Sequence, residues 1–151
     1  MKKIGNQNIY IEIDCDSHSG DLIDLLLVVD GLETGSLRSA IYIPAFIDSL
    51  EQLLTNSDYF CSKINLELFC AMVANKELEH KNICVFEDPI SDFMKRCVRN
   101  NDYLYFYFKL CEGHFFDYKN IQVGVPIIKV IEMNAFIDFL NKLKLYFDYK
   151  R

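Results

Sequence analysis

The chain has 151 residues, of which 51% are hydrophobic and 14% aromatic, enough for one domain with a sizeable core. Its 22 acidic and 16 basic residues give a formal net charge of −6. Nucleic-acid binding needs clustered Lys and Arg to neutralise phosphates, so direct nucleic-acid binding is disfavoured. No apolar run reaches the roughly 18 residues of a membrane span, and no apolar segment follows the N-terminal lysines as in a signal peptide. We therefore expect one cytoplasmic domain, residues 1–151, that does not associate with membranes.

The first third of the chain is predicted to form three strands and a helix. Residues 8–14 alternate isoleucine with polar side chains, as in a half-buried strand. Residues 22–29 are almost entirely apolar, which fits a strand covered on both faces or a short buried helix. A turn at Asp30 and Gly31 separates them from a third strand at 37–43. Pro44 suits the first turn of a helix, and the following apolar stripe predicts a helix at about 45–55.

The middle of the chain has mixed patterns. Apolar residues alternate over 62–73, which favours a strand, although their spacing also fits a helix. A further short strand is predicted at 82–87. Pro89 and the apolar spacing of residues 90–98 predict a short helix.

The last third is predicted to contain two strands and a helix. Residues 103–111 alternate strictly, with leucine and phenylalanine on one face and tyrosine and lysine on the other. A loop at 113–120 leads to a strand at 122–132, which Gly124 and Pro126 should bend or place at an edge. An apolar stripe then predicts a helix at 134–147.

Two segments ninety positions apart share almost the same sequence. Residues 45–50 read Ala-Phe-Ile-Asp-Ser-Leu, and residues 135–140 read Ala-Phe-Ile-Asp-Phe-Leu. Each segment follows a predicted strand, so both helices should bury their stripes on the same core, including Phe46 and Phe136. The predicted fold class is α+β: a single domain built mainly of antiparallel sheet, with these two amphipathic helices packed on it.

Negative charge is concentrated in the first 60 residues, which have a net charge of −7, whereas residues 61–151 have a net charge of +1. This asymmetry favours a basic protein partner, although a solvated acidic face needs no partner. The tyrosines of the 103–111 strand could add an apolar anchor to such an interface, or they could lie under a helix. The candidate partner-binding residues are Glu12, Asp14, Asp16, Asp21, Asp24, Asp30, Glu33, Tyr103, Tyr105 and Tyr107.

No catalytic, metal or cofactor motif is recognisable. The six cysteines lack a C-x-x-C pair and are predicted to be reduced core residues. Asp14, Asp16 and His18 share one strand parity and could hold a divalent cation, but a polar turn explains them as well. Cys111 and His114 could form a thiol–imidazole pair. The alternatives to a binding protein are thus a small metal-binding or thiol enzyme, or an adaptor subunit of a larger assembly.

The order of elements resembles that of immunity proteins from bacterial polymorphic toxin systems, notably the wall-associated-protein toxin and contact-dependent growth inhibition groups. The resemblance is carried by the acidic first strand, the helix from Pro44 to Thr55, the alternating segment Ile64–Leu68, the strand pair 103–111 and 122–132, and the terminal helix. Residues 74–100 look like an insertion in this pattern. The resemblance implies a non-catalytic acidic protein that binds and neutralises one cognate toxin domain, often a basic nuclease.

Overall fold

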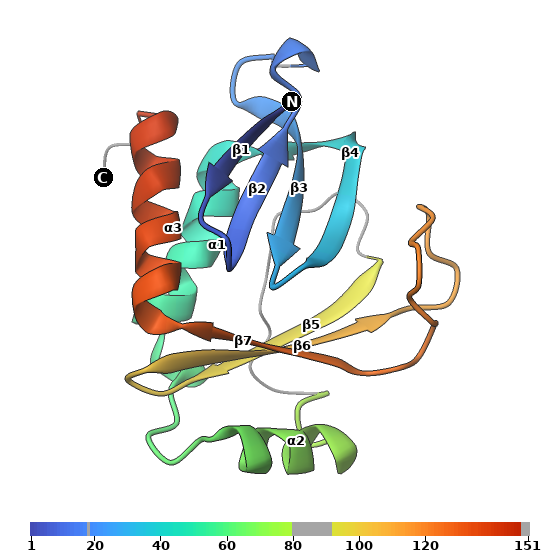
Figure 1. Cartoon of the computed structure of the whole chain (residues 1–151), viewed down its shortest axis with the longest axis vertical. Coiled ribbons are helices and arrows are strands. Elements are labelled where there is room, and N and C mark those ends of the chain that lie inside the picture. The colour runs from blue at the N-terminus through green and yellow to red at the C-terminus, as the bar shows by residue number, and fades with distance from the viewer. Residues whose placement is uncertain (18, 80–91, 149–151) are drawn as a thin grey trace.

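The computed structural model describes residues 1–17, 19–79 and 92–148 and shows an α+β fold with two antiparallel sheets (Figure 1). Sheet A consists of β1 (Lys2–Gly5), β2 (Ile9–Ile13), β3 (Leu22–Val29) and β4 (Leu32–Tyr42), in that order. Sheet B consists of β5 (Phe93–Arg99), β6 (Tyr103–Leu110) and β7 (Ile127–Glu132), also in chain order. The predicted fold class is confirmed, and its strands are divided between the two sheets.

Sheet A follows the predicted alternation. The three isoleucines of β2 are fully buried, and they lie opposite the buried Leu25, Leu27 and Val29 of β3. Asp30 and Gly31 both have positive φ, 44° and 79°, the backbone of the two-residue turn that matches strand twist. β4 begins earlier than predicted, at Leu32, because a register shift opposite Asp24 and Leu26 makes room for extra residues.

The two related segments form equivalent helices. Helix α1 (Ile43–Thr55) begins directly after β4, and α3 (Met133–Tyr146) begins directly after β7. Phe46 is 1% exposed and Phe136 is 0% exposed, so the prediction that both stripes enter the core is confirmed. Figure 1 shows α1 and α3 side by side next to sheet A.

Sheet B separates two apolar clusters. Phe106, Phe108 and Ile131 on one face join the main core, together with the inner face of sheet A, α1 and α3. The opposite face, including Tyr105 and Tyr107, packs against Phe69 of helix α2 (Leu66–Ala74). Figure 1 shows α2 on the side of sheet B that faces away from sheet A.

In two segments the secondary structure differs from the prediction. The 62–73 segment contains α2 rather than a strand, since the Asn65 side chain accepts a hydrogen bond from the Leu68 N–H (2.8 Å) and caps the helix. The 90–98 segment contains β5 rather than a helix. Both faces of β5 are covered, so apolar side chains occur at both parities and imitate helical spacing. The strand predicted at 82–87 lies outside the described residues.

The remaining short elements are the 3₁₀ turns η1 (Cys15–Ser17) and η2 (Ser57–Tyr59). Among the described helices, none combines the length and apolar character that a membrane crossing requires.

Candidate functional site

The structure divides the seven candidate acidic residues among three places. Glu12 lies on β2 and forms an ion pair with Lys3, with 3.4 Å between Oε1 and Nζ. Asp30 and Glu33 lie at the β3–β4 hairpin. The other four lie where β2 passes through η1 into β3, at the opposite end of sheet A (Figure 1). We call this last group the acidic end: Asp14, Asp16, Asp21 and Asp24.

Backbone hydrogen bonds hold the acidic end together. The Asp14 N–H donates to the Asp24 carbonyl at 3.2 Å, which places Asp14, directly after β2, beside Asp24 of β3. The Asp16 N–H donates to Oδ1 of Asp14 at 3.0 Å, so Asp14 stabilises the turn as an Asx side chain does. The Asp21 carbonyl accepts from the Ile43 N–H at 2.9 Å. Asp16 and Asp21 are exposed to solvent.

Two large apolar side chains border the acidic end. Leu22 and Tyr42 are cross-strand partners in β3 and β4, and they are 45% and 46% exposed. Cross-strand partners project from the same face of a sheet, so the two side chains form one small apolar surface beside Asp21. The acidic end therefore combines negative charge with exposed apolar area.

Asp30 and Glu33, the acids at the β3–β4 hairpin, lie far from the acidic end. β3 has eight residues and so extends for roughly 25 Å, well beyond the screening length of about 8–10 Å at physiological salt. Asp30 also has a cationic neighbour, since its Oδ2 lies 3.9 Å from Nζ of Lys129. The structure therefore does not bring all seven acids into one surface.

The tyrosine row is mostly covered. Tyr105 and Tyr107 are 5% and 4% exposed, and the ring of Tyr105 lies 5.6 Å from that of Phe69 in α2. Burial raises the pKa of Tyr105. The prediction of these two rings as partner contacts is corrected, because α2 occupies the face that they would present.

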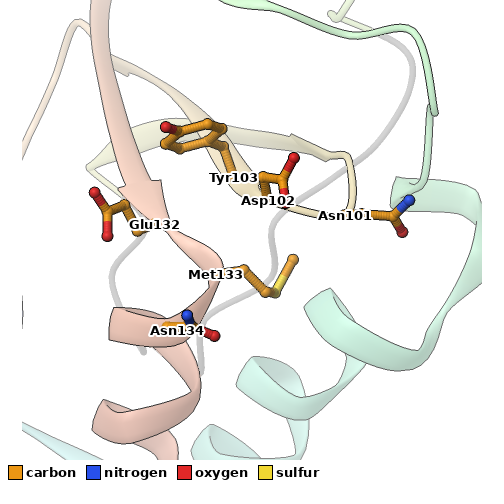
Figure 2. A pocket seen from close by; sticks show the side chains of 6 residues that line it. All are labelled: Asn101, Asp102, Tyr103, Glu132, Met133 and Asn134. Atoms are coloured by element: carbon orange, nitrogen blue, oxygen red, sulfur yellow. The ribbon is translucent and has the colours of Figure 1, made fainter.

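Tyr103 remains accessible, with 40% of its surface exposed. It lies opposite Glu132 at the end of the β6–β7 pair. Both side chains line a hollow of about 300 Å³, together with Asp102 and the start of α3. Figure 2 shows how these lining side chains lie. This hollow lies on sheet B, whereas the acidic end belongs to sheet A.

The alternative sites are not assembled by the described residues. His18 lies outside them, and within the described ranges no three His, Cys, Asp or Glu side chains are grouped to hold a metal ion. The Cys111 thiol contacts the Lys109 carbonyl at 3.8 Å, and Nδ1 of His114 lies 2.7 Å from the Phe116 carbonyl. Both groups are thus engaged with backbone oxygens.

The predicted burial of the cysteines is wrong for Cys15, Cys61 and Cys70, which are exposed. Cys97 is buried in β5 and Cys111 is half-buried, whereas Cys84 lies outside the described residues. Cys70 is exposed because the apolar segment around it forms α2, which buries only the side that faces sheet B.

Sequence reasoning missed Asp92, which is 4% exposed. Its carboxylate accepts hydrogen bonds from the N–H groups of Phe115 (2.8 Å) and Phe116 (3.1 Å) and from the Tyr118 hydroxyl (2.9 Å). Asp92 therefore positions the long connection between β6 and β7. A lone aspartate before an apolar run carries no motif that would have indicated this role.

Comparison of the chain with protein-family models, curated proteins and solved structures gives no match. Of the predicted site residues, the structure groups Asp14, Asp16, Asp21 and Asp24 at one exposed end of sheet A.

Proposed function

We propose that the protein is a non-catalytic binding protein that uses the acidic end to bind a basic protein partner. The observation that carries the proposal is the position of the acidic end beside the exposed Leu22–Tyr42 pair. Negative charge speeds encounter with a basic surface, and exposed apolar side chains supply area that becomes buried on contact. A merely solvated acidic face would have no need of the adjoining apolar pair.

The partner class follows from the resemblance to immunity proteins. We assign the protein as a cytoplasmic immunity protein, and the partner as a cognate toxin domain with a basic surface, such as a nuclease. Such a domain would have its positively charged substrate-binding surface covered by the acidic end. Neutralisation then requires binding only, and no catalytic group of the immunity protein takes part.

Toxicity in cells tests this proposal. An immunity gene is expected directly downstream of its toxin gene, so the probe is the toxin domain encoded by the neighbouring upstream gene. Cells that express this domain should survive when they also express the parent protein. The double variant Asp16→Lys and Asp21→Lys should lose protection, because it reverses two exposed charges of the acidic end.

A charge-matched control separates the effect of charge at the acidic end from the effect of the net charge of the protein. Glu33→Lys and Asp58→Lys also reverse two exposed acids, but these residues lie outside the acidic end. This control should still protect cells. Equal protection by both double variants, with both proteins folded, would show that the acidic end is not the binding surface.

A further inference from the structure

Among the described strands, none pairs with the outer edge of β7 in sheet B. The strand order β5-β6-β7 places it at the end of the sheet, and Figure 1 shows it as the strand nearest the viewer, crossing in front of β5 and β6. Its sequence, Ile-Ile-Lys-Val-Ile-Glu, is mostly β-branched, and residues 127–130 are only half-buried. An apolar edge strand of this kind is a ready template for pairing with another chain.

The register with β6 shows which backbone groups face the free edge. The Met133 N–H donates to the Asp102 carbonyl at 2.8 Å, and Tyr103 lies opposite Glu132. Because hydrogen-bonded pairs alternate along antiparallel strands, Ile127, Lys129 and Ile131 bond to β6. The N–H groups of Ile128, Val130 and Glu132 therefore point away from the sheet.

The side chain of Lys129, whose charge would discourage pairing, is directed toward sheet A. A lysine on an edge strand normally disfavours the addition of a further strand. Here Nζ of Lys129 lies 3.9 Å from Oδ2 of Asp30 at the tip of the β3–β4 hairpin, so Lys129 is held toward sheet A. Within the part of the chain that the structure describes, no strand pairs with the outward backbone groups of β7.

From this arrangement we infer that β7 pairs antiparallel with β7 of a second copy of the chain, about a two-fold axis at Val130. In this register the Val130 N–H and carbonyl bond to Val130 of the second copy, and the Glu132 N–H bonds to the Ile128 carbonyl. The edge is thus self-complementary. A two-fold axis at Lys129 would set two lysines opposite each other and pair Glu132 with Pro126, which has no N–H.

The short length of β7 predicts a weak dimer. β7 has six residues and is about 20 Å long, and Val125 before it, 45% exposed, would meet the start of α3 of the second copy. A strip of this size is at the lower end of specific interfaces. The dimer should therefore dissociate on dilution and form at higher protein concentration.

Sedimentation velocity over a range of protein concentrations tests the inference. The parent should shift from monomer to dimer as its concentration rises. Val130→Pro removes an outward N–H while the β6 bonds remain, because proline is accepted where the N–H faces away from the sheet. This variant should stay monomeric at every concentration, whereas Val130→Ala, which keeps the N–H, should still dimerise.

Each result of these experiments either supports or overturns the β7–β7 dimer. A parent that stays monomeric overturns the inference, even if Val130→Pro weakens binding of the upstream toxin domain and so assigns the edge to that partner. A Val130→Pro variant that dimerises like the parent shows that another surface is used. Should Val130→Pro fail to fold, Val130→Cys decides: paired residues in this register have Cα atoms about 5.5 Å apart, within disulfide reach. A mapped disulfide between the new thiols supports the inference, and its absence in a folded protein under oxidation overturns it.

Discussion

Replacing Asp92 with alanine should loosen the β6–β7 connection and destabilise the whole fold. Asp92 is 4% exposed, and its carboxylate accepts hydrogen bonds from Phe115, Phe116 and Tyr118. Alanine leaves all three donors without this acceptor. The loop then loses its side-chain hydrogen bonds to Asp92, and Tyr118 loses the bond that holds its ring against Phe93, where the ring centroids are 4.9 Å apart.

The expected loss can be estimated from the contacts. A hydrogen bond to a charged group contributes about 1.5–3 kcal/mol, but removal of the carboxylate also relieves a desolvation cost of several kcal/mol. Phe115 is 76% exposed, so water can replace part of the lost bonding in the loop. We therefore expect Asp92→Ala to lower the free energy of unfolding by about 2–4 kcal/mol, whereas Tyr118→Phe, which removes one hydroxyl, should cost about 1 kcal/mol.

Urea unfolding followed by circular dichroism would measure these differences. Asp92→Asn is the matched variant, because its amide keeps the size of the side chain but directs an NH₂ group at one of the donors. Hydrogen exchange at the Phe115 and Phe116 amides should accelerate in both Asp92 variants. A change below about 0.5 kcal/mol for Asp92→Ala, with unchanged amide exchange, would refute the anchoring role.

Three further outcomes are expected. Phe46→Ala and Phe136→Ala should each lower the free energy of unfolding by about 3–5 kcal/mol in urea titrations, whereas Phe115→Ala, at an exposed position, should change it by less than about 0.5 kcal/mol. A loss for either core variant as small as that for Phe115→Ala would contradict the equivalence of the two helices in one core. Because burial raises the pKa of Tyr105 in the folded state, the contribution of Tyr105 to stability is complete below its unfolded pKa of about 10 and is lost as pH rises through its folded pKa. Tyr105→Phe should flatten this alkaline decline in stability. An identical decline in the variant would contradict this role of Tyr105. Gly5→Ala should lower the midpoint of thermal unfolding, because φ is +137° there and an added Cβ would lie 2.5 Å from a β2 carbonyl oxygen; an unchanged midpoint would show that the β1–β2 turn relaxes freely.

Local patterns predicted those elements in which one face is buried and the other is not. The isoleucines of β2 alternate with polar side chains, and the stripes of α1 and α3 leave polar residues outside, so each period is visible in the sequence. The pattern of β5 fails because sheet B is covered on both faces. Apolar residues then occupy both parities, and strand and helix spacing become indistinguishable.

The candidate site was predictable only in part for a related reason. Charge counting identifies the acidic first third, and the turn after β2 groups Asp14 and Asp16. The separation of Asp30 from them depends on the length of β3. The apolar sequence of residues 22–29 fits either a strand or a short buried helix, which differ in length, so the sequence alone does not predict this separation. The covering of Tyr105 depends on α2, a segment that the alternation of residues 62–73 predicts as a strand.

The most direct test of the acidic end as the binding surface is the association rate constant with the upstream toxin domain, measured against salt. The screening length falls from about 10 Å at 0.1 M to about 3 Å at 1 M, so the parent should associate more slowly as salt rises. At low salt, Asp16→Lys with Asp21→Lys should slow association by at least tenfold and flatten the salt dependence. Glu33→Lys with Asp58→Lys should behave nearly as the parent. If both double variants slow association equally, or if the parent rate is independent of salt, the account of the acidic end is contradicted.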